Sequence, residues 1–137
     1  AVIIGRDCQN LGTTLSYSMP VFAAQFVPSF NKRDKERPVI AYAGIGSPEK
    51  FFSSIKEAGY HICAKHAFPD HHPYSASELR SLHAKSRKLG AQLITTEKDF
   101  VRIEPNAREG IEPFLITLRW SDEKAFSDFL DDQLKAS

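Results

Sequence analysis

The most reactive grouping in the sequence is a carboxylate followed by two histidines, Asp70-His71-His72. A carboxylate beside an imidazole fixes the tautomer of the ring and raises its basicity, which suits proton transfer or contact with a phosphate. A proline on either side of the loop restricts its backbone. His66 lies nearby, so a divalent metal site stays open, although the spacing of these histidines does not match a familiar zinc pattern. A loop with only a structural role is the remaining alternative.

A glycine-rich turn, Gly44-Ile45-Gly46-Ser47-Pro48, follows an apolar run. Small residues between a strand and a helix N-terminus leave backbone N–H groups free to meet a phosphate or a carboxylate. The turn has neither the G-x-x-x-x-G-K-[ST] pattern of a Walker loop nor the third glycine of a dinucleotide fingerprint. Two interpretations remain: an anion-contacting turn, or a tight turn that needs glycine only for its backbone dihedral angles.

A third polar segment, Thr96-Glu97-Lys98-Asp99, offers a hydroxyl, a cation and two carboxylates. Lys98 is suited to a phosphate, and acidic residues stabilise the first turn of a helix. Thr96 and Asp99 also stand at the spacing of a helix N-terminal cap. The segment is therefore either a ligand-contacting strand end or an ordinary cap.

The elements that must position these segments are short Val- and Ile-rich runs separated by stretches of helical periodicity. This pattern is typical of parallel strands joined by crossover helices. We expect strands over 2–5, 20–27, 38–43, 60–64, 91–95 and 113–118, and helices over 48–58, 75–89, 96–103 and from 121 onward, with loops over 6–18, 31–37, 66–74 and 104–112.

The sequence thus predicts an α/β protein, one domain over residues 1–137, with a mostly parallel sheet between two helical layers and Rossmann-like topology. Ligands of such sheets bind beyond the carboxyl ends of the strands. The three polar segments all lie at those ends and are expected to meet there.

Composition narrows the class of protein. With 42% hydrophobic and 26% charged residues the chain is neither disordered nor fibrous. A formal net charge of +1 gives no electrostatic case for nucleic acid. The two cysteines lack the C-x-x-C spacing of a zinc knuckle or dithiol. No apolar run is long enough to span a membrane, so we expect a soluble chain, and its abrupt start on a strand suggests a piece of a longer protein.

Three stretches taken together, VIAYAGIGSPEKFF at 39–52, FPDHH at 68–72 and LITTEKD at 93–99, resemble the C-terminal half of the tetraacyldisaccharide 4'-kinase family, the lipid A kinases of Gram-negative bacteria. The resemblance covers roughly residues 1–120. It implies transfer of the ATP γ-phosphate, with Mg²⁺, to the 4'-hydroxyl of a tetraacylated glucosamine disaccharide 1-phosphate. It places the enzyme at the cytoplasmic face of the inner membrane.

The resemblance also implies roles for individual residues. Asp70 and His71 are expected to be catalytic, with the imidazole near the transferring phosphate or a catalytic carboxylate. The residues expected to line the substrate cleft are Gly44, Gly46, Ser47, His72, Thr96, Glu97, Lys98 and Asp99. No metal ligand is expected in this chain.

Family members carry an N-terminal P-loop domain with a Walker lysine, the magnesium ligands and an acidic catalytic residue, and none of these lies within residues 1–137. Phosphoryl transfer depends on such groups for positioning and charge neutralisation. The resemblance therefore implies that this chain is inactive alone, holds neither ATP nor Mg²⁺, and works with that domain as its partner. The competing hypothesis is a stand-alone α/β module that binds an anionic ligand or partner without catalysis.

Overall fold

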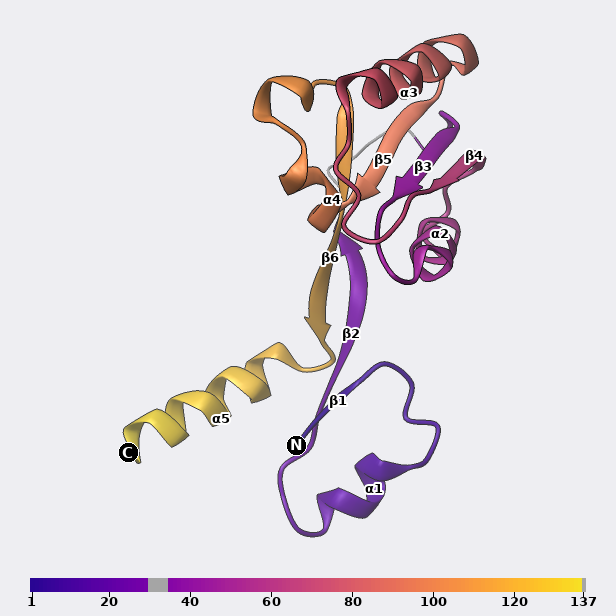
Figure 1. Ribbon diagram of the computed structural model, residues 1–137. Helices are drawn as coiled ribbons and strands as arrows, with labels where there is room; N and C mark the ends of the chain where they lie inside the picture. Colours follow the sequence, from indigo (N-terminus) through magenta and orange to yellow (C-terminus); the bar gives the residue numbers. More distant parts are fainter. Residues whose placement is uncertain (30–34, 137) are drawn as a thin grey trace. The chain divides into compact units, whose positions relative to one another are not determined.

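The computed structural model describes residues 1–29 and 35–136 (Figure 1). Part of the charged run expected to be a loop, residues 31–34, lies outside the described residues. The elements are β1 (Val2–Ile4), α1 (Leu11–Ser16), β2 (Phe22–Ser29), β3 (Val39–Ala43), α2 (Pro48–Glu57), β4 (Ile62–Ala67), α3 (Ala76–Leu89), β5 (Gln92–Thr96), α4 (Glu97–Arg102), the 3₁₀ turn η1 (Pro105–Ala107), β6 (Ile111–Trp120) and α5 (Glu123–Lys135).

Hydrogen bonds order the six strands as β1-β2-β6-β5-β3-β4. Contacts divide the chain into two compact units, the first made of Ala1–Val27 with Ile116–Ser137 and the second of Pro28–Leu115. Strands β2 and β6 each run from one unit into the other. The three polar segments singled out in the sequence all belong to the second unit.

The sheet of the second unit is parallel, with β3 paired to both β4 and β5, and β5 paired to β6. In chain order its strands therefore run 2-1-3-4, the order of a doubly wound fold. The chain reverses its direction of travel across the sheet between β3 and β5. Ligand sites of doubly wound sheets lie at this switch point, beyond the carboxyl ends of the two strands.

Strand β3 is the centre of the second unit, and all five of its residues are buried. Its alternate side chains enter two different cores, as the period of two in a strand requires. Val39, Ala41 and Ala43 pack with buried residues of α2, and Ile40 and Tyr42 pack with buried residues of α3. The expected sheet with a helix on each face is therefore confirmed in this unit.

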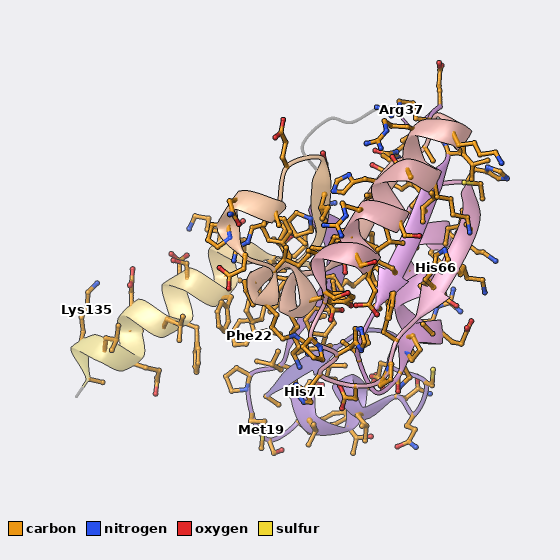
Figure 2. All side chains as sticks on the ribbon, turned by 45° about the horizontal axis from the view of Figure 1, so that its top comes forward. Met19, Phe22, Arg37, His66, His71 and Lys135 are labelled. Atoms are coloured by element: carbon orange, nitrogen blue, oxygen red, sulfur yellow. The ribbon has the colours of Figure 1, made fainter. Side chains whose placement is uncertain are left out.

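Helices α2 and α3 begin and end largely as expected. Ser75 and Glu78 form a complete capping box at the start of α3, and Gly90 ends it with a φ of +60°. Arg37 donates to the carbonyls of Gly90 and Ala91, beside the C-terminal end of α3 (Figure 2). Ser47 precedes Pro48 at the start of α2, and its side chain makes no capping hydrogen bond.

In the first unit, β1 and β2 pair in parallel, whereas β2 and β6 run in opposite directions (Figure 1). The sheet is therefore mixed and mostly parallel, which agrees with the expected fold class. Helix α5 packs by its aromatic face: the Phe22 ring lies 5.2 Å from that of Phe126 and 5.1 Å from that of Phe129, and Trp120 stacks on Phe126 at 3.7 Å.

The loop expected over residues 6–18 contains a helix, α1, so that expectation is wrong. The Asp7 carboxylate accepts hydrogen bonds from the backbone N–H groups of Leu11 at 2.8 Å and Gly12 at 2.7 Å. These bonds satisfy N–H groups that the first turn of a helix leaves free, and they hold the pKa of Asp7 below its usual value. Asn10, in the left-handed region at φ 52°, turns the chain into the helix.

Strand β2 spans Phe22–Ser29 instead of 20–27, and β4 and β6 also have different bounds from those expected. Strand β4 spans Ile62–Ala67 instead of 60–64 because its pairing continues to Ala43↔Ala67, at the very end of β3. Strand β6 begins at Ile111, within the expected loop, because Ile111 pairs with Leu93 of β5. In β4 and β6 the hydrogen bonds of a neighbouring strand, distant in sequence, set the limit.

Candidate functional site

The structure brings the three polar segments together at the switch point of the sheet. The backbone N–H of Phe68 donates to the carbonyl of Ala43 at 2.8 Å, and that of His71 donates to the carbonyl of Gly44 at 3.0 Å. The loop after β4 is thereby tied to the turn after β3. The N–H of Gly44 donates in turn to Oδ2 of Asp99, in α4, at 3.0 Å. Gly44 is thus the point at which all three segments are joined.

Asp99 is fully buried and is held by its own helix as well as by the glycine turn. The Thr96 hydroxyl donates to Asp99 Oδ2 at 2.6 Å and accepts the Asp99 N–H at 3.0 Å, which is the expected cap. Arg102 donates to Asp99 Oδ1 at 2.5 Å and to the carbonyl of Gly44 at 3.1 Å. Asp99 therefore binds the N–H of Gly44 and Arg102 binds its carbonyl, and we call this pair the clamp. Sequence reasoning missed Arg102, whose signal was its place three residues after Asp99.

A side chain at position 44 would crowd three neighbouring atoms. A Cβ there would lie 3.1 Å from each of three atoms: the Cβ of His72, the carbonyl oxygen of Pro69 and the hydroxyl oxygen of Tyr74. Gly44 is buried, so its role is to let the histidine loop approach the turn. Gly46 is exposed, and a Cβ built on it would lie 3.8 Å from Asp70 Oδ2.

His71 and Asp70 form the exposed edge of this site. The His71 side chain is 82% exposed, and its Nε2 lies 3.8 Å from Asp70 Oδ2. The backbone of His71 has a φ of +57°, in the left-handed region that few residues other than glycine adopt. The hydrogen bond from His71 N–H to Gly44 is part of what holds this conformation. Backbone strain of this kind is found at functional sites, where the surrounding structure sustains it.

His72, the next residue, points the other way and is packed into the protein. Its ring stacks on Phe68 with centroids 4.8 Å apart and meets the Tyr74 ring edge-on at 5.3 Å. Its Nε2 lies 2.9 Å from Oε1 of Glu78, the residue that also caps α3. Hydrogen bonds from Ser75, and then the His72 contact, hold the pKa of Glu78 below its usual value. The two adjacent histidines thus have different surroundings.

Buried hydroxyl groups lie beneath the loop. Burial raises the pKa of the Tyr42 and Tyr74 hydroxyls, and the nearby Asp99 carboxylate raises both further, so both rings stay neutral. Among the described residues, the hydroxyls of Tyr42 and Tyr74 and Nη1 of Arg102 are buried without a hydrogen-bond partner. The Tyr74 ring contacts the rings of Tyr42, Phe68 and His72, so it packs against the histidine loop.

The remaining candidate residues divide by exposure. The exposed candidates are Gly46, Ser47, Asp70, His71, Glu97 and Lys98. Two candidates, Thr96 and His72, are half-buried, and two others, Gly44 and Asp99, are buried. The exposed set offers an imidazole, an ammonium group, carboxylates and a hydroxyl to a molecule arriving from outside. Such groups can orient an anionic substrate and exchange protons with it.

His66 does not join the histidine loop. Figure 2 shows His66 and His71 well apart, His66 on β4 and His71 on the loop that follows it. The His66 Nε2 lies 3.1 Å from Nζ of Lys85, and burial together with this cation lowers the pKa of His66. Within residues 1–29 and 35–136, no group of three or more His, Cys, Asp and Glu side chains is placed to hold a metal ion.

No helix in the described part of the chain has the length and apolar character needed to cross a bilayer.

Comparison with known proteins identifies a family. The family described as LpxK, tetraacyldisaccharide-1-P 4'-kinase, matches residues 1–135. The chain is 38% identical over 132 residues to a tetraacyldisaccharide 4'-kinase of Paramagnetospirillum magneticum, a match that covers 95% of this chain and 41% of that protein. It is 42% identical over 108 residues to one of Methylorubrum extorquens, covering 79% of this chain and 33% of the relative.

A solved structure supports the fold. The crystal structure of LpxK from Aquifex aeolicus in complex with ATP aligns with a TM-score of 0.60 at 20% identity, over 84% of this chain and 36% of that one. The chain therefore spans well under half the length of the proteins that it matches.

Proposed function

The chain belongs to the tetraacyldisaccharide 4'-kinase family of lipid A biosynthesis, and we propose that it forms the histidine-bearing wall of that kinase's active site. The reaction transfers the γ-phosphate of ATP to the 4'-hydroxyl of a tetraacylated glucosamine disaccharide 1-phosphate. The observation that carries the proposal is the exposed His71, held in a left-handed conformation beside Asp70. The reaction is inferred from the family, and the imidazole of His71 is a group suited to that reaction.

His71 is the catalytic residue in this proposal. As a hydrogen-bond donor or cation it steadies charge on the phosphate oxygens, or it pairs with an acidic base on the facing part of the enzyme. Asp70 Oδ2 lies 3.8 Å from His71 Nε2 and limits the orientation of the ring. Lys98, Ser47 and Gly46 are exposed, and in this proposal they contact the acceptor or its phosphate.

In this proposal ATP and Mg²⁺ are held mainly outside this chain. Mg²⁺ is held by carboxylates and substrate phosphates, and the described residues bring no three His, Cys, Asp or Glu side chains together. The sequence contains no G-x-x-x-x-G-K-[ST] loop to cradle a triphosphate. The proposal therefore places both on an N-terminal P-loop domain, leaves this chain inactive alone, and locates the reaction at the cytoplasmic side of the inner membrane, where the lipid substrate lies.

The test is a His71→Ala substitution in a parent-length kinase that contains this sequence. General acid–base groups contribute roughly 10²–10⁴-fold, so kcat should fall by that order while the KM for ATP changes little, because the P-loop holds the nucleotide. His61→Ala is the matched control, an exposed histidine of the same unit that precedes β4. An unchanged kcat in His71→Ala would remove this residue from catalysis.

A second variant separates the two adjacent histidines. His72→Ala removes a ring that stacks on Phe68 and contacts Glu78, so it should lower thermal stability. Any loss of activity should be recovered at lower temperature, whereas that of His71→Ala should persist. Calorimetry of the 137-residue chain with ATP adds an independent measurement, because tight binding would favour a stand-alone nucleotide-binding module instead.

A further inference from the structure

A cavity of about 510 Å³ lies on the α3 side of the second unit, between α3 and the segment that follows α4. None of the histidine-loop or glycine-turn residues lines it. Its volume is in the range of about 300–1,000 Å³ that is typical of small-molecule sites. The polar residues around it are Arg80, His83, Arg87, Asn106 and Glu109.

Three basic side chains on one face of α3 dominate the lining. Arg80, His83 and Arg87 follow each other at intervals of three and four residues, so they lie in one stripe along the helix. Among the described residues, neither guanidinium group has a hydrogen-bond or ion-pair partner. Both arginines are exposed, so their donors are free to meet a molecule that enters the cavity.

Two other arginines of the same unit show the contrast. Arg108 donates to the carbonyls of Ile103 at 2.8 Å and Val101 at 3.0 Å, and its guanidinium lies over the Phe100 ring. Arg102 is bound to Asp99 and Gly44. The side chains of Arg102 and Arg108 stabilise the fold through these hydrogen bonds. Those of Arg80 and Arg87 make no such bond with the described residues.

The other lining residues suit a ligand that has an anionic group attached to a less polar part. Asn106 provides an amide, and Ala76, Leu79 and Ala107 provide apolar surface. Glu109 is the single carboxylate against two guanidinium groups, so the local charge is positive even with His83 neutral. Gly110, at φ +72°, brings the backbone close to the His83 ring, since a Cβ there would lie 3.5 Å from Cε1.

We propose that this cavity binds a small molecule through a phosphate group, with Arg80 and Arg87 as the charged donors. The planar fork of a guanidinium matches two phosphate oxygens at once, which makes arginine the residue best suited to this contact. The site is separate from the histidine loop. The proposal therefore does not rest on the proposed kinase function.

The test is a chemical-shift titration of the ¹⁵N-labelled chain at constant ionic strength. The probes are inorganic phosphate, glucose 1-phosphate and vesicles of phosphatidylglycerol, with phosphatidylcholine vesicles as the uncharged control. Saturable shifts are expected at the amides of His83 and Gly110. The Arg80→Gln/Arg87→Gln double variant should weaken binding about tenfold or more, because it removes charge-assisted hydrogen bonds.

Lys88→Gln is the matched variant, because Lys88 is an exposed cation of the same helix that does not line the cavity. It should bind as the unmodified chain does, and a thermal melt confirms that each variant is folded. Binding of the soluble probes identifies a free phosphate ester, and binding of the anionic vesicles alone identifies a lipid headgroup. The proposal is overturned if no probe gives saturable shifts, or if Lys88→Gln weakens binding as much as the double variant.

Discussion

Asp99→Ala should destabilise the second unit more than any exposed substitution near the site. Asp99 is fully buried and accepts hydrogen bonds from Gly44, Thr96 and Arg102. Removing it leaves the buried N–H of Gly44 without a partner, which costs about 1–3 kcal/mol. It also leaves the Arg102 cation unpaired, and breaking a buried pair costs about 3–5 kcal/mol. The Arg102 side chain is 26% exposed, so the cost of leaving its charge unpaired falls near the lower limit of that range.

The expected loss in the free energy of unfolding is therefore about 3–5 kcal/mol, since the two effects share atoms and do not add fully. Urea unfolding followed by circular dichroism measures it. Amide hydrogen exchange in β3 provides a local readout, and a loss of 3 kcal/mol corresponds to more than about a hundredfold faster exchange. Asp99→Asn keeps the shape and an acceptor for Gly44, so it should cost less than Asp99→Ala.

Asp70→Ala is the control for this measurement. Its carboxylate is 54% exposed on the neighbouring loop, and surface substitutions usually change stability by less than about 0.5 kcal/mol. If Asp99→Ala were as stable as Asp70→Ala, the clamp would not hold the glycine turn. The reasoning that ties α4 to the histidine loop would then be refuted.

Four further outcomes follow from single features of the second unit. Ser75→Ala should cost about 1 kcal/mol by removing the cap of α3, measured by thermal unfolding. Because the folded pKa of Glu78 lies below its unfolded value, the associated stability is present above about pH 4.5 and is lost as pH falls through the folded pKa, which an NMR titration of Glu78 should show. Phe52→Ala should cost about 3–5 kcal/mol in urea unfolding because its ring is only 2% exposed, whereas the adjacent exposed Ser53→Ala should have little effect. Gly90→Ala should cost about 1 kcal/mol from backbone strain alone, since a Cβ at φ +60° meets no atom within 4 Å; an unchanged melting temperature would contradict this.

Features set by neighbours in sequence could be predicted without the structure. The capping box of Ser75 and Glu78, the glycine that ends α3 and the cap at Thr96 each depend on residues within one or two helical turns. The apolar run of β3 likewise identifies a strand buried on both faces, because side chains alternate along it. The α/β class and the meeting of three strand ends followed from this local information. Helix α1 was missed because the carboxylate that accepts from its first N–H groups belongs to Asp7, three residues before the N-cap Asn10 and outside the usual spacing.

Only the tertiary structure decided which candidate residues face outward. His71 and His72 are adjacent and identical in type, yet the first is 82% exposed and the second 20%. The His72 ring packs against Phe68, Tyr74 and Glu78. The His71 backbone is instead bonded to Gly44, which is itself bonded to Asp99, 55 residues after Gly44 in the chain. The sequence patterns likewise did not predict that β2 and β6 run in opposite directions. Sequence patterns report local geometry, whereas exposure depends on which distant segments the folded chain brings into contact.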